Sequence, residues 1–84
     1  MKLNILHFVD NAQVSTLEVE GTVKSSIASI NSSELIAFSP YTANKQSRVQ
    51  WTRDGVKKEY VVAKVLKQKL DATRAPFYYE VQLG

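Results

Sequence analysis

Arg48 to Val62 reads RVQWTRDGVKKEYVV and carries the clearest structural signal in the chain. Two runs of strand-forming residues flank an Asp54-Gly55 pair, which favours a tight turn because glycine reaches positive φ without a Cβ clash. The stretch therefore predicts a β-hairpin over about 48–62. Val49 and Trp51 fall on one face of its first strand, whereas the residues that alternate with them are polar. That face needs to be buried, so the rest of the chain has to supply a layer that covers it.

Toward the N-terminus, the pattern of apolar residues predicts further strands. Residues 2–9 carry apolar side chains of both parities, which is typical of a strand covered on both faces. The turn signal Asp10-Asn11 follows. Residues 13–20 then predict a second strand with one apolar and one polar face, which ends at Gly21.

Two segments ahead of the hairpin are less regular. Residues 22–30 fit a helix by the spacing of their apolar residues, but their serines compete for backbone hydrogen bonds. We favour a strand or a short irregular segment there and leave the helix open. Residues 34–38 (ELIAF) predict a short strand buried on both faces, and the polar residues after it predict an exposed loop over 40–47.

Residues 63–72 (AKVLKQKLDA) predict a short helix. The apolar residues from Val62 to Leu70 follow an i, i+3, i+4, i+8 spacing, and most of the segment consists of good helix formers. The alternative is that the second hairpin strand simply continues through this segment. Residues 77–83 alternate strictly between apolar and other side chains, which predicts a C-terminal strand with a strongly apolar face.

Together these elements predict an α+β fold that is mainly β. We expect a small single-layer or partly closed antiparallel sheet of five to six strands, with the hairpin at its centre and one short helix. Because so short a sheet is not expected to close easily into a barrel, it should leave edge strands open to another chain. The C-terminal strand is the expected edge, and its outward-facing residues are the candidate interface: Tyr78, Glu80 and Gln82. The alternative is that this strand lies inside the sheet, between neighbours from the same chain.

The composition fits one small globular domain over residues 1–84. The chain is 44% hydrophobic and 23% charged and contains no cysteine, which excludes disulfides, thiolate nucleophiles and cysteine-bound metals. The N-terminal run MKLNILHFVDN is too short and too interrupted for a signal peptide. No segment approaches the roughly 20 apolar residues of a membrane span. We therefore expect a cytoplasmic or virion protein that has no membrane partner.

Positive charge is concentrated in the second half of the chain. Residues 45–74 carry nine lysines and arginines against three acidic residues, whereas residues 1–44 carry two against four. Such an asymmetry can indicate a polyanionic partner. The candidate polyanion-binding residues are Arg48, Arg53, Lys57, Lys58 and Lys64. Trp51, Tyr60 and Tyr41 are candidate stacking groups for bases, although its parity places Trp51 in the core. The alternative is a solvated face that keeps the protein soluble.

The residues that catalysis or metal binding requires are scarce. The single histidine, His7, lies in an apolar alternation and is interpreted as a packed, hydrogen-bonded residue. Glu18 and Glu20 share one strand face and are interpreted as solvent-facing residues. The three glycines are far apart, so no phosphate-binding loop exists, and no serine has the partners of a catalytic triad. We predict no enzymatic activity, no metal ion and no cofactor.

The order of elements over residues 27–81 resembles that of the LytTR DNA-binding domain of response regulators. The segments that carry this resemblance are ELIAFSPY, RVQWTRDGVKKEYVV, AKVLKQKL and FYYEVQ. The His-Arg-Ser segment that follows the aromatic strand in that family is missing, because the chain reads FYYEVQLG from Phe77. The resemblance therefore adds only to a nucleic-acid hypothesis, and we assign the chain to no family.

The sequence predicts a non-enzymatic protein that acts through protein–protein contacts as a structural or assembly component, such as a subunit of a virion or another repeated particle. The expected partner is another protein or a second copy of the chain, which would make a homo-oligomer. The alternative is a small nucleic-acid-binding or regulatory protein that uses the basic segment 45–74. Such binding should be weak and strongly dependent on salt.

Overall fold

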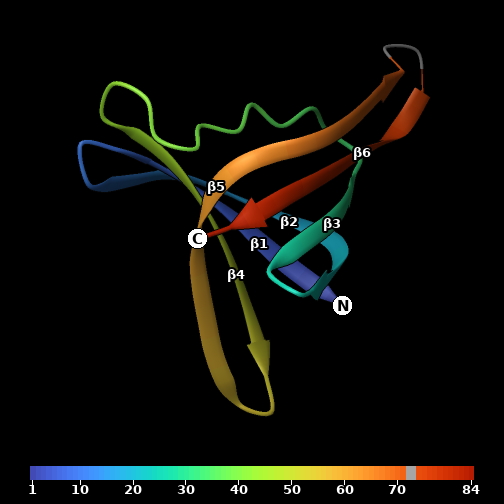
Figure 1. Ribbon diagram of the computed structural model, residues 1–84, viewed down its shortest axis with the longest axis horizontal. Coiled ribbons are helices and arrows are strands. Elements are labelled where there is room, and N and C mark those ends of the chain that lie inside the picture. Colours follow the sequence, from blue (N-terminus) through green and yellow to red (C-terminus); the bar gives the residue numbers. More distant parts are fainter. Residues whose placement is uncertain (72–73) are drawn as a thin grey trace.

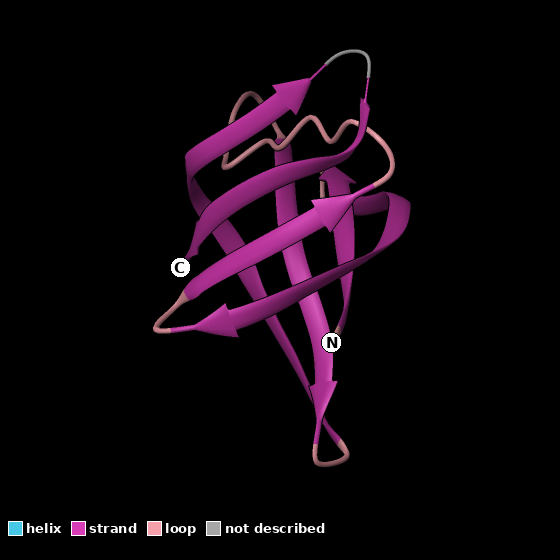
Figure 2. Cartoon of the chain, turned by 90° about the vertical axis from the view of Figure 1, so that its right-hand side faces the viewer, coloured by secondary structure: helices cyan, strands magenta, loops and turns pink. Residues whose placement is uncertain are grey.

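Six antiparallel strands close into a barrel in the computed structural model, which describes residues 1–71 and 74–84. In chain order they are β1 (Lys2–Val9), β2 (Ala12–Lys24), β3 (Ile27–Ser32), β4 (Lys45–Arg53), β5 (Val56–Asp71) and β6 (Arg74–Leu83). Around the barrel they follow the order β1-β2-β3-β6-β5-β4, and β4 then pairs with β1 (Figures 1 and 2). Within the described ranges the chain forms no helix, and hence none that is long and apolar enough to cross a membrane.

Among the described residues, four tight turns place non-glycine residues at positive φ. The predicted turn at Asp54-Gly55 is confirmed: their φ angles of 53° and 77° fit the type I′ geometry that matches the twist of a two-residue hairpin. The turn predicted at Asp10-Asn11 is confirmed in the same way. The β4–β5 hairpin, which turns at Asp54-Gly55, projects well beyond the barrel (Figure 1, lower part).

Strand β2 turns one corner of the barrel at Gly21. The strand pairs with β1 up to Glu20 and with β3 from Glu20 onward. A Cβ added at Gly21 would lie 2.3 Å from the Ser29 carbonyl oxygen and 2.8 Å from Cδ1 of Leu3. Glycine is therefore required here because two backbones approach closely, and the prediction that Gly21 ends the strand is wrong. Two serines of the ambiguous segment 22–30, Ser25 and Ser26, form the next turn, and Ser29 lies in β3, so that segment is two strands and a turn.

Strand β5 turns the opposite corner, where the sequence predicts a helix over 63–72. That prediction is wrong: residues 63–71 continue the hairpin strand, and Ala72 lies outside the described residues. Bulges follow Val62, Val65 and Lys69 in the pairing with β6. Each bulge adds a residue to one strand, so the inward-facing residues Val62 and Val65 are three apart instead of two. Apolar residues three apart are also typical of one face of a helix, which is why the sequence pattern predicts a helix here.

The barrel interior holds the hydrophobic core. Its buried residues come from all six strands and one loop: Leu3, Ile5, Val19, Ala28, Ile30, Ile36, Val49, Trp51, Val62, Phe77, Tyr79, Val81 and Leu83. The hairpin residues that needed a cover, Val49 and Trp51, are therefore buried inside the closed sheet. The expectation of a single-layer or partly closed sheet is wrong, because long, bent β2 and β5 let a chain of this length close.

The residues between β3 and β4 lie on the opposite side of the molecule from the tip of the β4–β5 hairpin (Figure 1). The strand predicted at 34–38 is absent, because this segment pairs with no other strand and follows the barrel surface instead. It is also not buried on both faces: Ile36 is buried, whereas Leu35 is 63% exposed. The Ile36 N–H donates to the Tyr79 hydroxyl at 2.8 Å, and Phe38 meets the Tyr79 ring edge to face.

Candidate functional site

The pairing of β4 with β5 divides the predicted basic residues between two faces of the hairpin. Arg53 lies on the same face as Trp51, because side chains two apart on a strand point the same way. Lys58 pairs directly with Trp51 and joins that face. Arg48 and Lys57 lie on the opposite face. The structure therefore brings Arg53 and Lys58 together and separates them from the other two cations.

The face that carries Arg53 and Lys58 overlooks a groove at the base of the hairpin, which we call the hairpin groove. Its volume is about 260 Å³. It is lined by Met1, Val23, Ser26, Trp51, Arg53, Lys58, Tyr60, Leu83 and Gly84. No Asp or Glu occurs among the described residues that line it, and the two charged side chains of its lining, those of Arg53 and Lys58, are both positive.

Tyr60 provides an aromatic surface inside the hairpin groove. Its ring stacks on Trp51 with a centroid distance of 5.6 Å and an interplanar angle of 30°. Trp51 is only 6% exposed, which confirms its predicted place in the core, whereas Tyr60 is 44% exposed. The buried indole holds the phenol ring in place while part of that ring stays open to solvent. Tyr41, the third candidate stacking residue, is exposed but lies apart from the groove, in the loop before β4.

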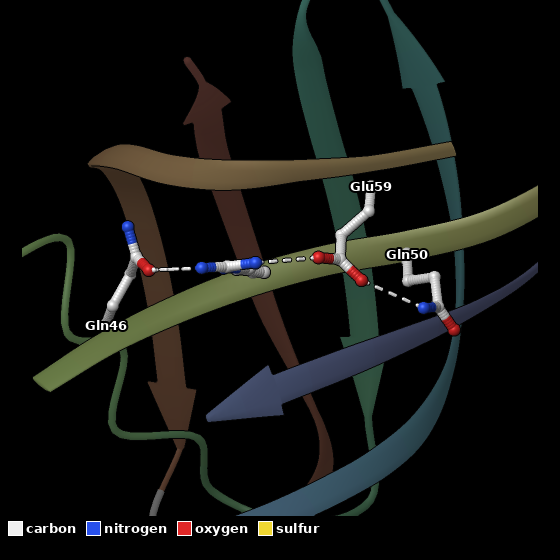
Figure 3. Close-up of polar contacts among 4 residues, drawn as sticks. Gln46, Gln50 and Glu59 are labelled. Carbon is white, nitrogen blue, oxygen red and sulfur yellow. Dashed lines mark hydrogen bonds and ion pairs between the residues drawn. The ribbon is translucent and has the colours of Figure 1, made fainter. Parts of the chain in front are cut away.

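A polar network on the outer face of the hairpin holds Arg48, and Figure 3 labels the other members of this network, Gln46, Gln50 and Glu59. The Arg48 guanidinium donates two hydrogen bonds to Oε1 of Gln46 and one, of 2.9 Å, to Oε2 of Glu59, whose other oxygen accepts from Gln50. The guanidinium also lies 4.3 Å from the centroid of the Phe8 ring. The Arg48 hydrogen bond, with smaller help from Gln50 and neighbouring positive charge, lowers the pKa of Glu59. The positive charge of Arg48 is thus paired with the carboxylate of Glu59 in the same chain, and Arg48 is not a free cation for a polyanionic partner.

Lys64 lies on the outer face of β5, in a row with two further lysines. The register pairs Lys64 with Gln82, Lys67 with Glu80 and Lys69 with Tyr78. We call Lys64, Lys67 and Lys69 the lysine row. The bulges of β5 keep all three on the outside, because Val65 and Gln68, which lie between them, pair with the inward-facing Val81 and Tyr79 of β6.

The candidate interface residues Tyr78, Glu80 and Gln82 lie beside the lysine row on the outer face of β6. Tyr78 and Glu80 are half-buried, and Gln82 is exposed. Strand β6 pairs with β3 on one side and β5 on the other, so the prediction that it is a free edge is wrong. Any partner of these residues has to contact the face of the sheet.

His7 forms a hydrogen-bonded cluster away from the hairpin groove, which confirms its interpretation as a packed residue. Its Nδ1 lies 2.9 Å from the hydroxyl oxygen of Ser47, which also accepts a hydrogen bond from the Ser39 N–H at 2.8 Å. Burial lowers the pKa of His7. Ser47 is fully buried, so its hydroxyl cannot meet a substrate and the cluster serves to attach the β3–β4 loop.

Carboxylates elsewhere do not gather into a metal site. Among residues 1–71 and 74–84, no three His, Asp or Glu side chains come close enough together to hold an ion. Glu18 and Glu20 project from β2 as exposed residues, and the Lys2 ammonium donates to Glu18 at 3.0 Å. This hydrogen bond, with added attraction from both glutamates, raises the pKa of Lys2.

Several residues of the candidate site escape prediction from the sequence. Met1, Val23, Ser26 and Leu83 line the hairpin groove only because barrel closure brings distant segments to one end. No local pattern marks them. Continuing the hairpin strand through 63–71 with a regular period of two would place Lys67 and Lys69 on the face opposite Lys64, so the lysine row also depends on the bulge between Val65 and Lys67.

Comparison with known proteins identifies no relative. No family model matches the chain, and no curated protein or solved structure matches it significantly. The resemblance to the LytTR domain thus gains no support. Function therefore has to be inferred from the residues of the site itself.

Proposed function

We propose that the protein is a non-enzymatic nucleic-acid-binding module and that Arg53 and Lys58 contact the phosphate backbone at the hairpin groove. One observation carries the proposal: these two cations converge with the half-exposed Tyr60 on one face of the hairpin, and the described lining of the groove contains no acidic side chain. Arginine and lysine are the usual partners of phosphate oxygens, and arginine can contact two of them at once. Binding of this kind is independent of sequence and weakens with salt.

The test is a series of binding titrations at increasing salt. Labelled single-stranded oligonucleotides of unrelated sequence are titrated with the wild type and with Arg53→Gln/Lys58→Gln, and fluorescence anisotropy is measured. Removing two phosphate contacts should lower the slope of log K against log salt by about 1.4, at about 0.7 for each contact to a single strand. The loss should be similar for all sequences.

A matched control removes two charges from another face. Lys64→Gln/Lys69→Gln deletes the same net charge from the lysine row, and it should change affinity and slope much less. Equal losses from the two double variants would place the binding outside the groove. Absence of binding by the wild type at low salt would refute the proposal.

Assembly as a structural subunit is the second candidate function, and the charge of two opposite walls favours it. The lysine row lies on β5, and the exposed Glu18 and Glu20 lie on β2, which is three strands away in either direction around the barrel. Glu18 and Glu20 already contact Lys2 and the N-terminal ammonium, so the lysine row of the next copy has to replace these two exposed ion pairs, which are worth little in water. Light scattering should then give a mass above that of the monomer, and Glu18→Lys/Glu20→Lys, which reverses the charge of the acidic wall, should reduce it to the mass of a folded monomer. A wild type that stays monomeric at high micromolar concentration would refute assembly.

A further inference from the structure

We infer that the hairpin groove accepts an unpaired base of a single-stranded nucleic acid, with the base stacked on Tyr60. The inference rests on the proposed function and adds the class of ligand. It follows from the exposure of the Tyr60 ring, from the residue that supports that ring, and from the positions of the two cations around it.

The aromatic surface is preorganised. Tyr60 stacks on Trp51, which is buried in the core and does not have to move when a ligand arrives. Tyr60 is 44% exposed and borders the hairpin groove. Stacking on such a ring requires a flat group with an accessible face. Bases inside a duplex are covered by their neighbours, so away from the ends of a duplex only an unpaired base can meet this ring.

Arg53 and Lys58 line the hairpin groove together with Tyr60, so the groove presents positive charge next to an aromatic ring. Lys58 is two residues from Tyr60 on β5, and Arg53 is two residues from Trp51 on β4, so all four side chains project from one face. A nucleotide likewise carries a flat base and an anionic phosphate a short distance apart. A duplex can contact Arg53 and Lys58 through its phosphates, but it offers no base to the ring of Tyr60. A single strand can make both contacts.

The chain contains a built-in reporter for this contact, because Trp51 is its only tryptophan. Since the indole supports Tyr60 and lines the groove, a base that stacks there should change the fluorescence of Trp51. A phosphate chain without bases should change it much less. The optical signal therefore separates stacking from charge attraction.

The experiment compares three ligands of equal length, about 12 nucleotides each: a single strand, the same backbone without bases, and a blunt duplex. The protein carries no tag at either end, because Met1 and Gly84 both line the groove. The wild type should bind the single strand roughly 5- to 150-fold more tightly than the abasic strand, which is the usual contribution of one stacked base. The duplex should also bind more weakly, and only the single strand should change Trp51 fluorescence strongly.

Two tyrosine variants and one control locate the stacking. Tyr60→Ala should remove the preference for the single strand over the abasic strand, and Tyr60→Phe should retain it because the ring is kept. Tyr41→Ala changes a tyrosine of the β3–β4 loop, outside the groove, and should bind like the wild type. Circular dichroism verifies that each variant is folded. If Tyr60→Ala does not fold, Tyr60→Phe still tests the inference, because loss of the preference for the single strand in this variant would contradict stacking on the ring.

The outcomes distinguish the inference from the proposed function. Equal wild-type affinity for the single and abasic strands, or for the single strand and the duplex, would overturn the inference while leaving phosphate binding in place. An unchanged preference in Tyr60→Ala would also overturn it. Equally tight binding of a polyglutamate peptide would point to an acidic protein partner and would overturn base recognition. Failure to bind any of the nucleic-acid ligands would refute the proposed function itself.

Discussion

Gly21→Ala should destabilise the protein by about 2 kcal/mol, because the new methyl group would collide with the backbone at a corner of the barrel. Its Cβ would lie 2.3 Å from the Ser29 carbonyl oxygen and 2.8 Å from Cδ1 of Leu3. Favourable contacts between heavy atoms lie near 3.5–4.0 Å, so the oxygen has to retreat by about 1 Å. Ser29 pairs with Thr22 on one side and Glu80 on the other, and moving it strains two ladders at once.

The expected loss of stability in Gly21→Ala combines two opposing effects. Overpacking of a rigid site costs about 1–3 kcal/mol, and the upper part of that range applies because the obstructing atom belongs to the backbone. Replacing glycine with alanine also reduces the entropy of the unfolded chain, which returns about 0.4–1 kcal/mol. The net loss of about 2 kcal/mol should lower the melting temperature by roughly 8–16 °C in a domain of this size.

Thermal and urea denaturation, followed by circular dichroism and by Trp51 fluorescence, measure this loss. Gly55→Ala is the matched control: its Cβ would meet nothing within 4 Å, so it incurs only the cost of positive φ, about 1–2 kcal/mol. Gly21→Ala should also raise amide exchange in β3 around Ser29, which Gly55→Ala should not. A Gly21→Ala protein as stable as the wild type, or with unchanged exchange there, would refute the steric argument for the corner.

Three further predictions concern the hairpin turn and the attachment of the β3–β4 loop. Gly55→Val should destabilise by more than about 1 kcal/mol, because a β-branched residue tolerates positive φ poorly, and an unchanged urea midpoint would count against the turn geometry. Tyr79→Phe should cost about 1–3 kcal/mol and speed amide exchange at Ile36, since the buried N–H of Ile36 loses its acceptor; unaltered exchange would contradict this. The pKa of His7 is below 6.5 in the folded state, so the unfolded chain binds the proton more readily and stability should fall as pH decreases from about 7 to 5.5. His7→Gln should show a weaker dependence on pH over that interval, and an equal dependence would exclude His7 as its source.

Alternation and turn chemistry predict the strands wherever the chain is regular. The sequence pattern places β1 at the observed residues 2–9 and the β4–β5 turn at Asp54-Gly55. It also places Trp51 in the core. These features depend on neighbouring residues along the chain, so local patterns contain the information that is needed.

The sequence pattern fails where tertiary structure changes the period of a strand. The bulges of β5 place its inward-facing residues three apart, which reads as a helix when no partner strand is known. At 34–38 an apolar run reads as a strand, but its residues pack on Tyr79 and the barrel surface without strand pairing. Barrel closure itself depends on the close approach at Gly21, which a lone glycine in the sequence does not distinguish from a strand end.

The candidate site was predictable in its charges but not in its geometry. Composition identifies the basic half, and parity separates Trp51 from Arg48. The capture of Arg48 by Glu59 and Gln46 depends on the register between β4 and β5, and the hairpin groove depends on the chain segments that barrel closure brings to one end. Both follow from pairing between distant parts of the chain.

The most direct test of the hairpin groove as a nucleic-acid site is amide NMR of the labelled protein during titration with a single strand of about 12 nucleotides. The largest shifts are expected at the Trp51 indole, Tyr60, Lys58 and Ser26, with Arg53 side-chain signals also affected. Signals from the β3–β4 loop around Leu35 should stay in place. Shifts confined to the lysine row and β6, or no shifts at low salt, would contradict the assignment of the groove.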